Sequence, residues 1–173
     1  MQIFKDILNG DVLASTTAPV KLVDGFLYEF ETRYMLKTND GRFIPEDEST
    51  DDDEGQLNLD FVLKHNLQLV HFDLHECYEK ERIETLNGFI GHYLRKVKYD
   101  MRAKHRSEED MNEYMKKTSK WSSDWHTDAR IKKLQFFVAR YDGSVVVVEE
   151  REVNGKETYV VMLPKEAVVV STE

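Results

Sequence analysis

Apolar residues recur at gaps of three and four along residues 79–130, which predicts two long helices. The first stripe consists of Ile83, Leu86, Ile90, Tyr93, Leu94, Val97 and Met101. The second consists of Met111, Tyr114, Met115, Thr118, Trp121 and Trp125. We expect the two helices to pair antiparallel and bury these stripes against each other. The first helix, of about 25 residues, would be roughly 40 Å long and would project from, or brace, a β body.

A short polar segment at residues 104–110 separates the two predicted helices. Ser107 is expected to begin the second helix, because its hydroxyl can accept a free backbone NH and Asp110 follows three residues later. Acidic side chains in that first turn suit the positive end of the helix dipole. Trp121 and Trp125, one helical turn apart, are interpreted as core residues in preference to a ligand cage.

Shorter apolar and alternating runs on both sides of the helices predict strands. They cover residues 2–7, 13–23, 26–36 and 57–74 before the helices, and residues 134–140, 145–150, 157–163 and 167–170 after them. Asp24-Gly25 and Asn154-Gly155 are hairpin signals, because these residue types tolerate a positive φ. The order of strands, helix pair and strands predicts one α+β domain over residues 1–173, closed by β segments from both ends.

Residues 39–56 interrupt this pattern with two acidic runs around Ser49 and Thr50. Only Phe43, Ile44 and Pro45 are apolar there, so we expect a mobile acidic loop. Clustered carboxylates could bind Ca²⁺ weakly, although the loop lacks the glycine and glutamate spacing of an EF-hand. Ser49 and Thr50 each precede an aspartate by three residues, which would suit an acid-directed kinase.

Charge and composition exclude several function classes. A net charge of −9 argues against general nucleic-acid binding, because the phosphate backbone would be repelled. We find no apolar run long enough to span a bilayer and no signal peptide, so we expect a cytoplasmic protein. The single cysteine, Cys77, excludes an intrachain disulfide and a multi-cysteine zinc site. No cofactor is expected.

No catalytic motif of the P-loop, dinucleotide-binding, nucleophile-elbow or zinc-protease type is present, so we do not expect an enzyme. Cys77 lies near His71 and His75, which leaves a thiol-dependent activity as an alternative. The favoured interpretation is a small residue at a strand-to-helix junction. On a strand the two histidines would lie about 13 Å apart, too far to share one metal ion.

One basic cluster lies near the end of the first predicted helix on this acidic chain. It consists of Arg95, Lys96, Lys98, Arg102, Lys104, His105 and Arg106. Cations near a helix C-terminus interact favourably with the helix dipole, which would give the cluster a purely structural role. The alternative is a docking surface for an acidic protein partner, attracted by its opposite charge.

Several segments resemble the translationally controlled tumour protein (TCTP) family, in the same order along nearly the whole chain. They are Met1-Gln2-Ile3-Phe4-Lys5-Asp6-Ile7, Lys21-Leu22-Val23-Asp24-Gly25-Phe26-Leu27-Tyr28-Glu29, Leu59-Asp60-Phe61-Val62-Leu63-Lys64-His65-Asn66-Leu67-Gln68, Phe89-Ile90 with Tyr93-Leu94, Leu134-Gln135-Phe136-Phe137-Val138 and Lys165-Glu166-Ala167. The resemblance implies a β-tent body, similar to the Rab-associated exchange-factor/chaperone fold, with a protruding helical hairpin.

The same resemblance implies a non-enzymatic cytoplasmic interaction protein that acts in growth and survival. The family is associated with microtubules, Ca²⁺ and anti-apoptotic partners, and its members can be secreted without a signal peptide. Tubulin tails are acidic, so the basic cluster predicts tubulin or microtubules as the partner. The chain ends Ser171-Thr172-Glu173, without the family's C-terminal cysteine, which excludes a disulfide dimer through that residue and favours a monomer.

Regulation of a small GTPase of the Rheb type, as exchange factor or chaperone, is the alternative that the resemblance implies. The family's N-terminal Asp-Glu pair is linked to GTPase binding; here Asp11 is kept and Val12 replaces the glutamate. A Phe-Phe-aliphatic-Gly-Glu block of the family ends here in Ala139 and Arg140. Losing two carboxylates and gaining a cation would weaken a charge-dependent contact with a GTPase.

Overall fold

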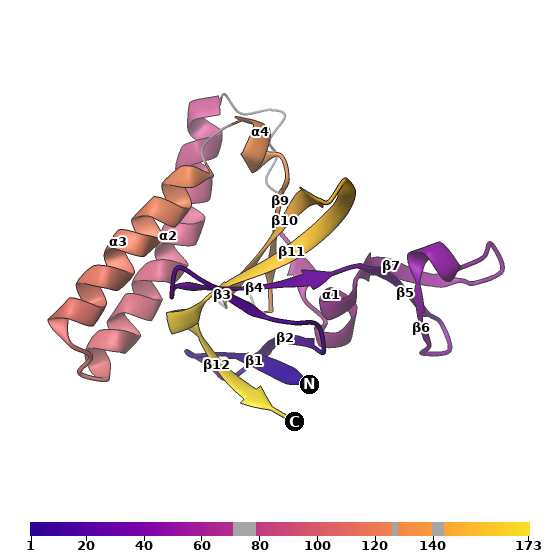
Figure 1. Ribbon diagram of the computed structural model, residues 1–173, viewed down its shortest axis with the longest axis horizontal. Helices are drawn as coiled ribbons and strands as arrows, with labels where there is room; N and C mark the ends of the chain where they lie inside the picture. The colour runs from indigo at the N-terminus through magenta and orange to yellow at the C-terminus, as the bar shows by residue number, and fades with distance from the viewer. Residues whose placement is uncertain (71–78, 126–127, 140–143) are drawn as a thin grey trace.

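The computed structural model describes residues 1–70, 79–125, 128–139 and 144–173, without the side chains of residues 79–87, 128 and 129. This part of the chain forms an α+β fold of three β-sheets and a helical hairpin (Figure 1). The strands are β1 (Gln2–Asp6), β2 (Val12–Thr16), β3 (Lys21–Val23), β4 (Leu27–Thr32), β5 (Tyr34–Thr38), β6 (Phe43–Pro45), β7 (Gly55–Leu59), β8 (Gln68–Leu69), β9 (Leu134–Val138), β10 (Val145–Val153), β11 (Lys156–Pro164) and β12 (Val168–Thr172). The helices are α1 (Asp60–His65), α2 (Glu79–Ala103), α3 (Glu108–Asp124) and α4 (Asp128–Ile131), with 3₁₀ turns η1 (Glu46–Glu48) and η2 (Lys165–Ala167).

The largest sheet is antiparallel, with the strand order β3-β4-β11-β10-β9-β8. A second sheet has the order β12-β1-β2, so the first and last strands of the chain lie side by side. The third sheet, β6-β5-β7, extends away from the helices (Figure 1). The prediction that β segments from both ends close one body is confirmed.

The helical hairpin is confirmed as α2 and α3, which lie antiparallel along one side of the β body (Figure 1). Ser107 caps α3, because its hydroxyl accepts the backbone NH of Asp110 at 3.1 Å. The Tyr114 hydroxyl donates a 2.8 Å hydrogen bond to the Leu94 carbonyl oxygen and so joins the two helices. Burial raises the pKa of Tyr114, which keeps this hydroxyl protonated as a donor.

The apolar stripes of the hairpin pack on one face of the six-stranded sheet. The shared core includes Ile90, Tyr93, Leu94, Val97, Trp121 and Trp125 from the helical region, and Val145, Val147, Val160 and Met162 from the sheet. Trp121 is 8% exposed and Trp125 is 1% exposed, which confirms both as core residues. The opposite face of the sheet packs in a second core with β1, β2 and α1, around Phe4, Phe61 and Phe137.

Both predicted hairpin turns are confirmed by their backbone angles. Asp24 and Gly25 have φ values of 54° and 64°, and they connect β3 to β4. Asn154 and Gly155 have φ values of 53° and 74°, and they connect β10 to β11. Two successive residues with positive φ match the right-handed twist of the paired strands.

Two strand predictions were wrong in their extent. The run at residues 26–36 is divided between β4 and β5, which belong to different sheets. The run at residues 57–74 contains helix α1 at Asp60–His65, where three successive residues, Phe61, Val62 and Leu63, are buried. Asp60 in its first turn and the left-handed Asn66 at its C-terminus are ordinary helix-end residues. Because all three of these successive residues are buried, the sequence lacks the spacing of an amphipathic helix here, and the helix was not predicted.

The acidic segment at residues 39–56 contains more regular structure than the loop prediction allowed. Its apolar triplet forms β6, and its last residues begin β7; both strands pair with β5. The acidic run between them includes η1, and none of the three η1 residues is buried. The segment therefore has strand structure at Phe43–Pro45 and from Gly55 onward, because cross-strand pairing with β5 satisfies its backbone there. The mobility of the acidic loop stays a prediction.

Candidate protein-interaction surfaces

Part of the basic cluster forms an exposed face on α2. Arg95, Tyr99 and Arg102 follow at spacings of four and three, which places them on one side of the helix. Tyr99 is 58% exposed, and the Arg102 guanidinium lies 6.0 Å from the centre of its ring. Within the described residues, no carboxylate lies at ion-pair distance from Arg95, Lys98 or Arg102. The exposed guanidinium groups of Arg95 and Arg102 are therefore available to a partner, and Lys98 is available with a half-buried side chain.

Two other members of the basic cluster form ion pairs within the chain. Lys104 forms a 2.7 Å ion pair with Asp100, and Arg106 binds both Asp110 and Glu166. Hydrogen bonds from Arg106 to Glu166, stronger than the opposing effect of burial, raise the pKa of Arg106. Lys96 and Lys98 are half-buried. The structural interpretation therefore applies to Lys104 and Arg106, whereas docking of a partner at the exposed members stays a prediction.

Asp11, the residue predicted to contact a GTPase, lies at one hollow with two positions that depart from the family's pattern. Asp11, Val12 and Ala139 line a depression of about 400 Å³, together with Lys64, His65 and Asn66. Asp11 and Val12 lie at the start of β2, whereas Ala139 follows β9, so only the tertiary fold brings them together. Arg140 lies outside the described residues.

A hydrogen bond between β2 and α1 lies beside this hollow. The Ser15 hydroxyl and the His65 Nε2 atom are 2.8 Å apart. Burial lowers the pKa of His65, and the positive charge of Lys64 lowers it further, against a smaller opposite effect of Asp60. His65 is therefore held in its neutral form near pH 7. The contact links β2 to α1 across 50 residues of chain.

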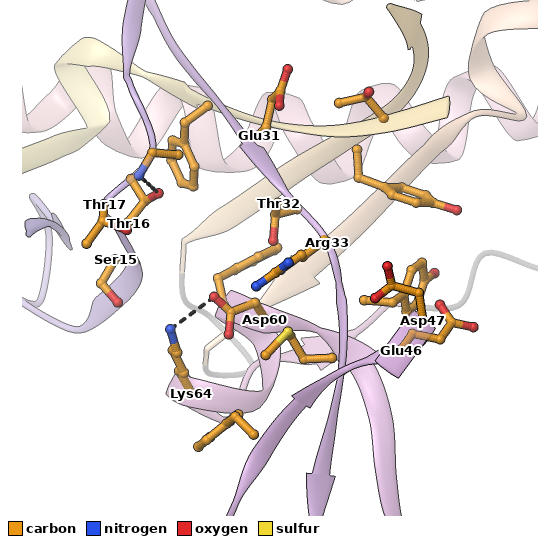
Figure 2. A pocket seen from close by; sticks show the side chains of 18 of the residues that line it. Ser15, Thr16, Thr17, Glu31, Thr32, Arg33, Glu46, Asp47, Asp60 and Lys64 are labelled. Atoms are coloured by element: carbon orange, nitrogen blue, oxygen red, sulfur yellow. Dashed lines mark hydrogen bonds and ion pairs between the residues drawn. The ribbon is translucent and has the colours of Figure 1, made fainter. Parts of the chain in front are cut away.

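A larger groove of about 870 Å³ lies where β2, α1, β4, β5, η1 and β11 converge (Figure 2). One part of its wall carries the hydroxyl groups of Ser15, Thr16 and Thr17, beside the 3.0 Å ion pair of Lys64 and Asp60. The part formed by η1, β5 and β11 carries Glu46, Asp47, Glu157, Tyr34 and Tyr159. No single stretch of the sequence indicates this groove, because its walls come from segments that lie far apart along the chain.

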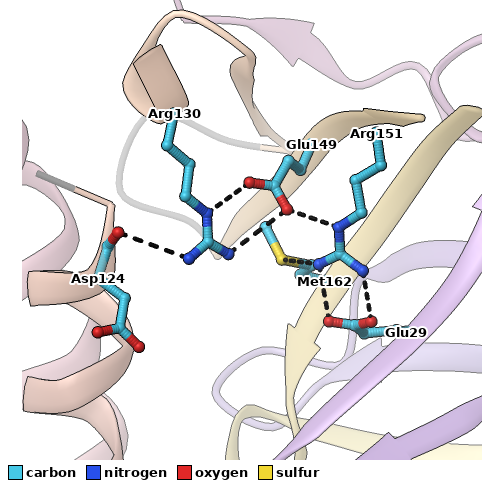
Figure 3. A network of polar contacts seen from close by, with 6 residues as sticks. All are labelled: Glu29, Asp124, Arg130, Glu149, Arg151 and Met162. Carbon is cyan, nitrogen blue, oxygen red and sulfur yellow. Dashed lines mark hydrogen bonds and ion pairs between the residues drawn. The ribbon is translucent and has the colours of Figure 1, made fainter. Parts of the chain in front are cut away.

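A polar network connects the helical side of the molecule to the sheet (Figure 3). Glu149 on β10 is 5% exposed and accepts hydrogen bonds of 2.6 Å from the Nε atoms of both Arg130 and Arg151. Arg151 also donates two bonds, of 2.7 and 2.9 Å, to Glu29 on β4. Burial alone would raise the pKa of Glu149, but the two arginines outweigh it and lower that pKa. The network therefore pairs the buried charge of Glu149 with two arginines.

The thiol-dependent alternative depends on Cys77, His71 and His75, which lie outside the described part of the chain. Among the residues described, no group of three or more His, Cys, Asp or Glu side chains could hold a metal ion. None of the described helices is long and apolar enough to cross a lipid bilayer.

Comparison with known proteins gives a consistent relationship over the whole chain. The sequence model of the family described as translationally controlled tumour protein matches residues 1–168. The homologue from Wuchereria bancrofti is 34% identical over 184 residues, which cover 98% of each chain. The homologue from Caenorhabditis elegans is 29% identical over 185 residues, also with 98% of each chain covered.

Solved structures agree with the fold. The solution structure of the Caenorhabditis elegans protein superposes with a TM-score of 0.74 at 28% identity, covering 99% of this chain and 98% of that one. The protein p23fyp from Schizosaccharomyces pombe gives a TM-score of 0.69 at 20% identity over all of both chains, a likeness of fold alone. By the family match, the sequence relatives and the shared β-tent architecture, this chain belongs to the translationally controlled tumour protein family.

Proposed function

We propose that this chain is a non-enzymatic interaction protein that binds tubulin or microtubules through the exposed face of α2. The observation that carries the proposal is the row of Arg95, Tyr99 and Arg102 along that face. Two exposed cations flank an aromatic ring that is 58% exposed, and the described residues include no ion-pair partner for either arginine. The partner-binding set is thereby reduced from the whole basic cluster to Arg95, Lys98 and Arg102.

Charge explains why an acidic partner is expected at this face. The chain as a whole has a net charge of −9, so a general attraction to acidic proteins is absent. A local basic face can still attract an acidic segment, because salt screens exposed charges beyond about 10 Å at 0.1 M ionic strength. The distant acidic residues of this chain would then contribute little to the encounter.

Co-sedimentation with microtubules tests the proposal. Reversing two charges by Arg95→Glu and Arg102→Glu should lower the pelleted fraction about fivefold, an effect that high salt should reproduce in the unaltered protein. The matched control is Lys116→Glu with Lys120→Glu, which makes the same charge change at exposed positions of α3. Equal pelleting of the α2 variant and the unaltered protein would refute the proposal.

We expect the protein to act in the cytoplasm, in growth and survival, with anti-apoptotic proteins as further partners. We also expect that it can be secreted without a signal peptide. It assigns no Ca²⁺ site, since the described residues offer no cluster of three or more suitable side chains. It retains a monomer as the working form. Titration with Ca²⁺, followed through tyrosine and tryptophan fluorescence, would show any weak binding by the acidic segment.

Regulation of a Rheb-type GTPase is the second candidate, and one observation favours it. Asp11, Val12 and Ala139, which correspond to two separate blocks of the family's sequence, line the same hollow. The retained carboxylate of Asp11 supports a contact there, whereas Val12 and the positive charge of Arg140 oppose it.

Release of a fluorescent nucleotide from the GTPase tests this second candidate. We expect little acceleration by the unaltered chain, and faster release with Val12→Glu and Arg140→Glu, which restore two carboxylates. The control is Lys21→Glu, a charge change at an exposed position of β3. Strong acceleration by the unaltered chain would show that the second candidate holds without the missing carboxylates. The absence of acceleration by the double variant would exclude it.

A further inference from the structure

We propose that the groove at β4, β11 and η1 binds an arginine- or lysine-bearing segment of a protein partner, in its acidic and aromatic part. This site lies on the β body and has the opposite charge to the α2 face, so it goes beyond the function proposed above. Three features carry the inference: the register of the sheet, the pair of tyrosines and the charge balance of the lining.

The register of the sheet places an acidic rim beside the core. Directly paired residues on β10, β11 and β4 form a buried apolar row, Val148, Val161 and Phe30. Two residues further along, the same face carries the row Glu150, Tyr159 and Thr32. The last row pairs Glu152 with Glu157. Side chains two residues apart on a strand share a face, so these glutamates continue the surface of the core outward. Glu157 lines the groove itself, and Glu150 and Glu152 lie beside it on β10.

The acidic rim is unfavourable for the isolated fold. Glu152 and Glu157 are direct cross-strand neighbours, and like charges in that relation destabilise a sheet. Contact with Glu157 also raises the pKa of Glu150. A cation bound between these carboxylates would remove the repulsion. The negative charge of these glutamates therefore favours the binding of a cation at the rim.

Two tyrosines give this surface an aromatic wall. Tyr34 and Tyr159 pack edge to face, with ring centres 5.0 Å apart and ring planes at 85°. Burial raises the pKa of Tyr159, and the neighbouring Tyr34 and carboxylates raise it further. A guanidinium or ammonium group binds over such a ring, and its attraction increases when carboxylates lie close by.

The charges that line the groove leave an excess of carboxylates. Lys64 is paired with Asp60 at 3.0 Å. The other charged lining side chains are four acids, Glu31, Glu46, Asp47 and Glu157, and two bases, Arg33 and Lys156. Glu46 and Asp47 belong to η1, which faces the groove from the small sheet opposite the strand rows (Figure 2). A segment with several cations would neutralise this wall, whereas an acidic or uncharged segment would not.

A peptide probe tests the site in the full chain. Fluorescence anisotropy would follow a short labelled peptide of alternating arginine and glycine residues, beside the same peptide with citrulline, which has the shape of arginine without its charge. We expect saturable binding of the arginine peptide alone. Glu46→Gln with Asp47→Asn should raise its Kd about fivefold.

The matched control is Asp51→Asn with Asp52→Asn. It removes the same two charges from the same exposed acidic segment, at positions that do not line the groove. We expect less than about a twofold change in Kd for this control. Circular dichroism would verify that both variants fold, and NMR would show shifted ring signals of Tyr34 and Tyr159 on binding. Equal weakening by both pairs of substitutions, equal binding of the citrulline peptide, or no saturable binding would each overturn the proposal.

Discussion

The guanidinium of Arg106 donates two hydrogen bonds to the carboxylate of Glu166, of 2.7 and 3.1 Å. Arg106 lies in the turn between α2 and α3, and Glu166 lies in η2 between β11 and β12. The pair therefore joins the tip of the helical hairpin to the β body, across 60 residues of chain. A third bond, from Arg106 Nε to Asp110 at 3.2 Å, holds the same side chain against the first turn of α3.

Arg106→Lys should destabilise the protein by about 1 kcal/mol, because lysine lacks the planar group that binds a carboxylate with two bonds. Amide hydrogen exchange in residues 104–110 should become faster. Urea denaturation and exchange mass spectrometry measure these effects. Lys104→Ala removes only an exposed pair and should cost less than about 0.5 kcal/mol. If Arg106→Lys left the free energy of unfolding unchanged, the two-bond contact of Arg106 with Glu166 would not contribute to stability.

Glu149→Gln should lower the free energy of unfolding by about 2 kcal/mol, since it leaves Arg130 and Arg151 without their shared buried carboxylate. The lowered pKa of Glu149 means that its contribution is present above the unfolded pKa and is lost as the pH falls through the folded one. The free energy of unfolding of Glu149→Gln should therefore depend less on pH below about pH 4.5 than that of the unaltered protein. Glu48→Gln, at an exposed position of η1, is the control for urea denaturation at each pH.

Stability should also fall as the solution is acidified from about pH 7.5 to pH 5.5, through protonation of His65. The pKa of His65 is lowered on folding, so the unfolded chain binds its proton first, near the ordinary value of 6.5. The contribution of neutral His65 is complete above that pH and is lost below it. His65→Gln should flatten this part of the curve of unfolding free energy against pH, whereas His92→Gln, at an exposed position of α2, should leave it as steep as before.

Trp125→Ala should cost about 3–5 kcal/mol, because it opens a cavity in the core between the helices and the sheet. The indole is 1% exposed and packs against Trp121, with ring centres 4.4 Å apart, and against Phe136 at 6.0 Å. Met115→Ala, at a side chain that is 43% exposed on α3, should cost less than about 1 kcal/mol. A small effect at Trp125 in thermal unfolding would contradict its role in the core.

The sequence by itself determined the features that depend on neighbours along the chain. The helices α2 and α3 followed from apolar stripes at helical spacing, and the start of α3 followed from Ser107 and Asp110. Both hairpin turns followed from residue pairs that tolerate positive φ. Helix α1 was missed because Phe61, Val62 and Leu63 are all buried, and a short run that is buried on every side has no period to identify it.

Only the tertiary structure decided which distant residues meet. Sequence spacing could not assign Arg106 to Glu166, bring Val12 next to Ala139, or align Glu150 with Tyr159 and Thr32, because each contact depends on strand register and helix packing. The basic cluster is divided partly for the same reason. Arg95 and Arg102 remain exposed, whereas Arg106 binds Glu166, a carboxylate that only folding brings within its reach. The pair of Lys104 with Asp100 is local, because the two residues lie four apart on α2.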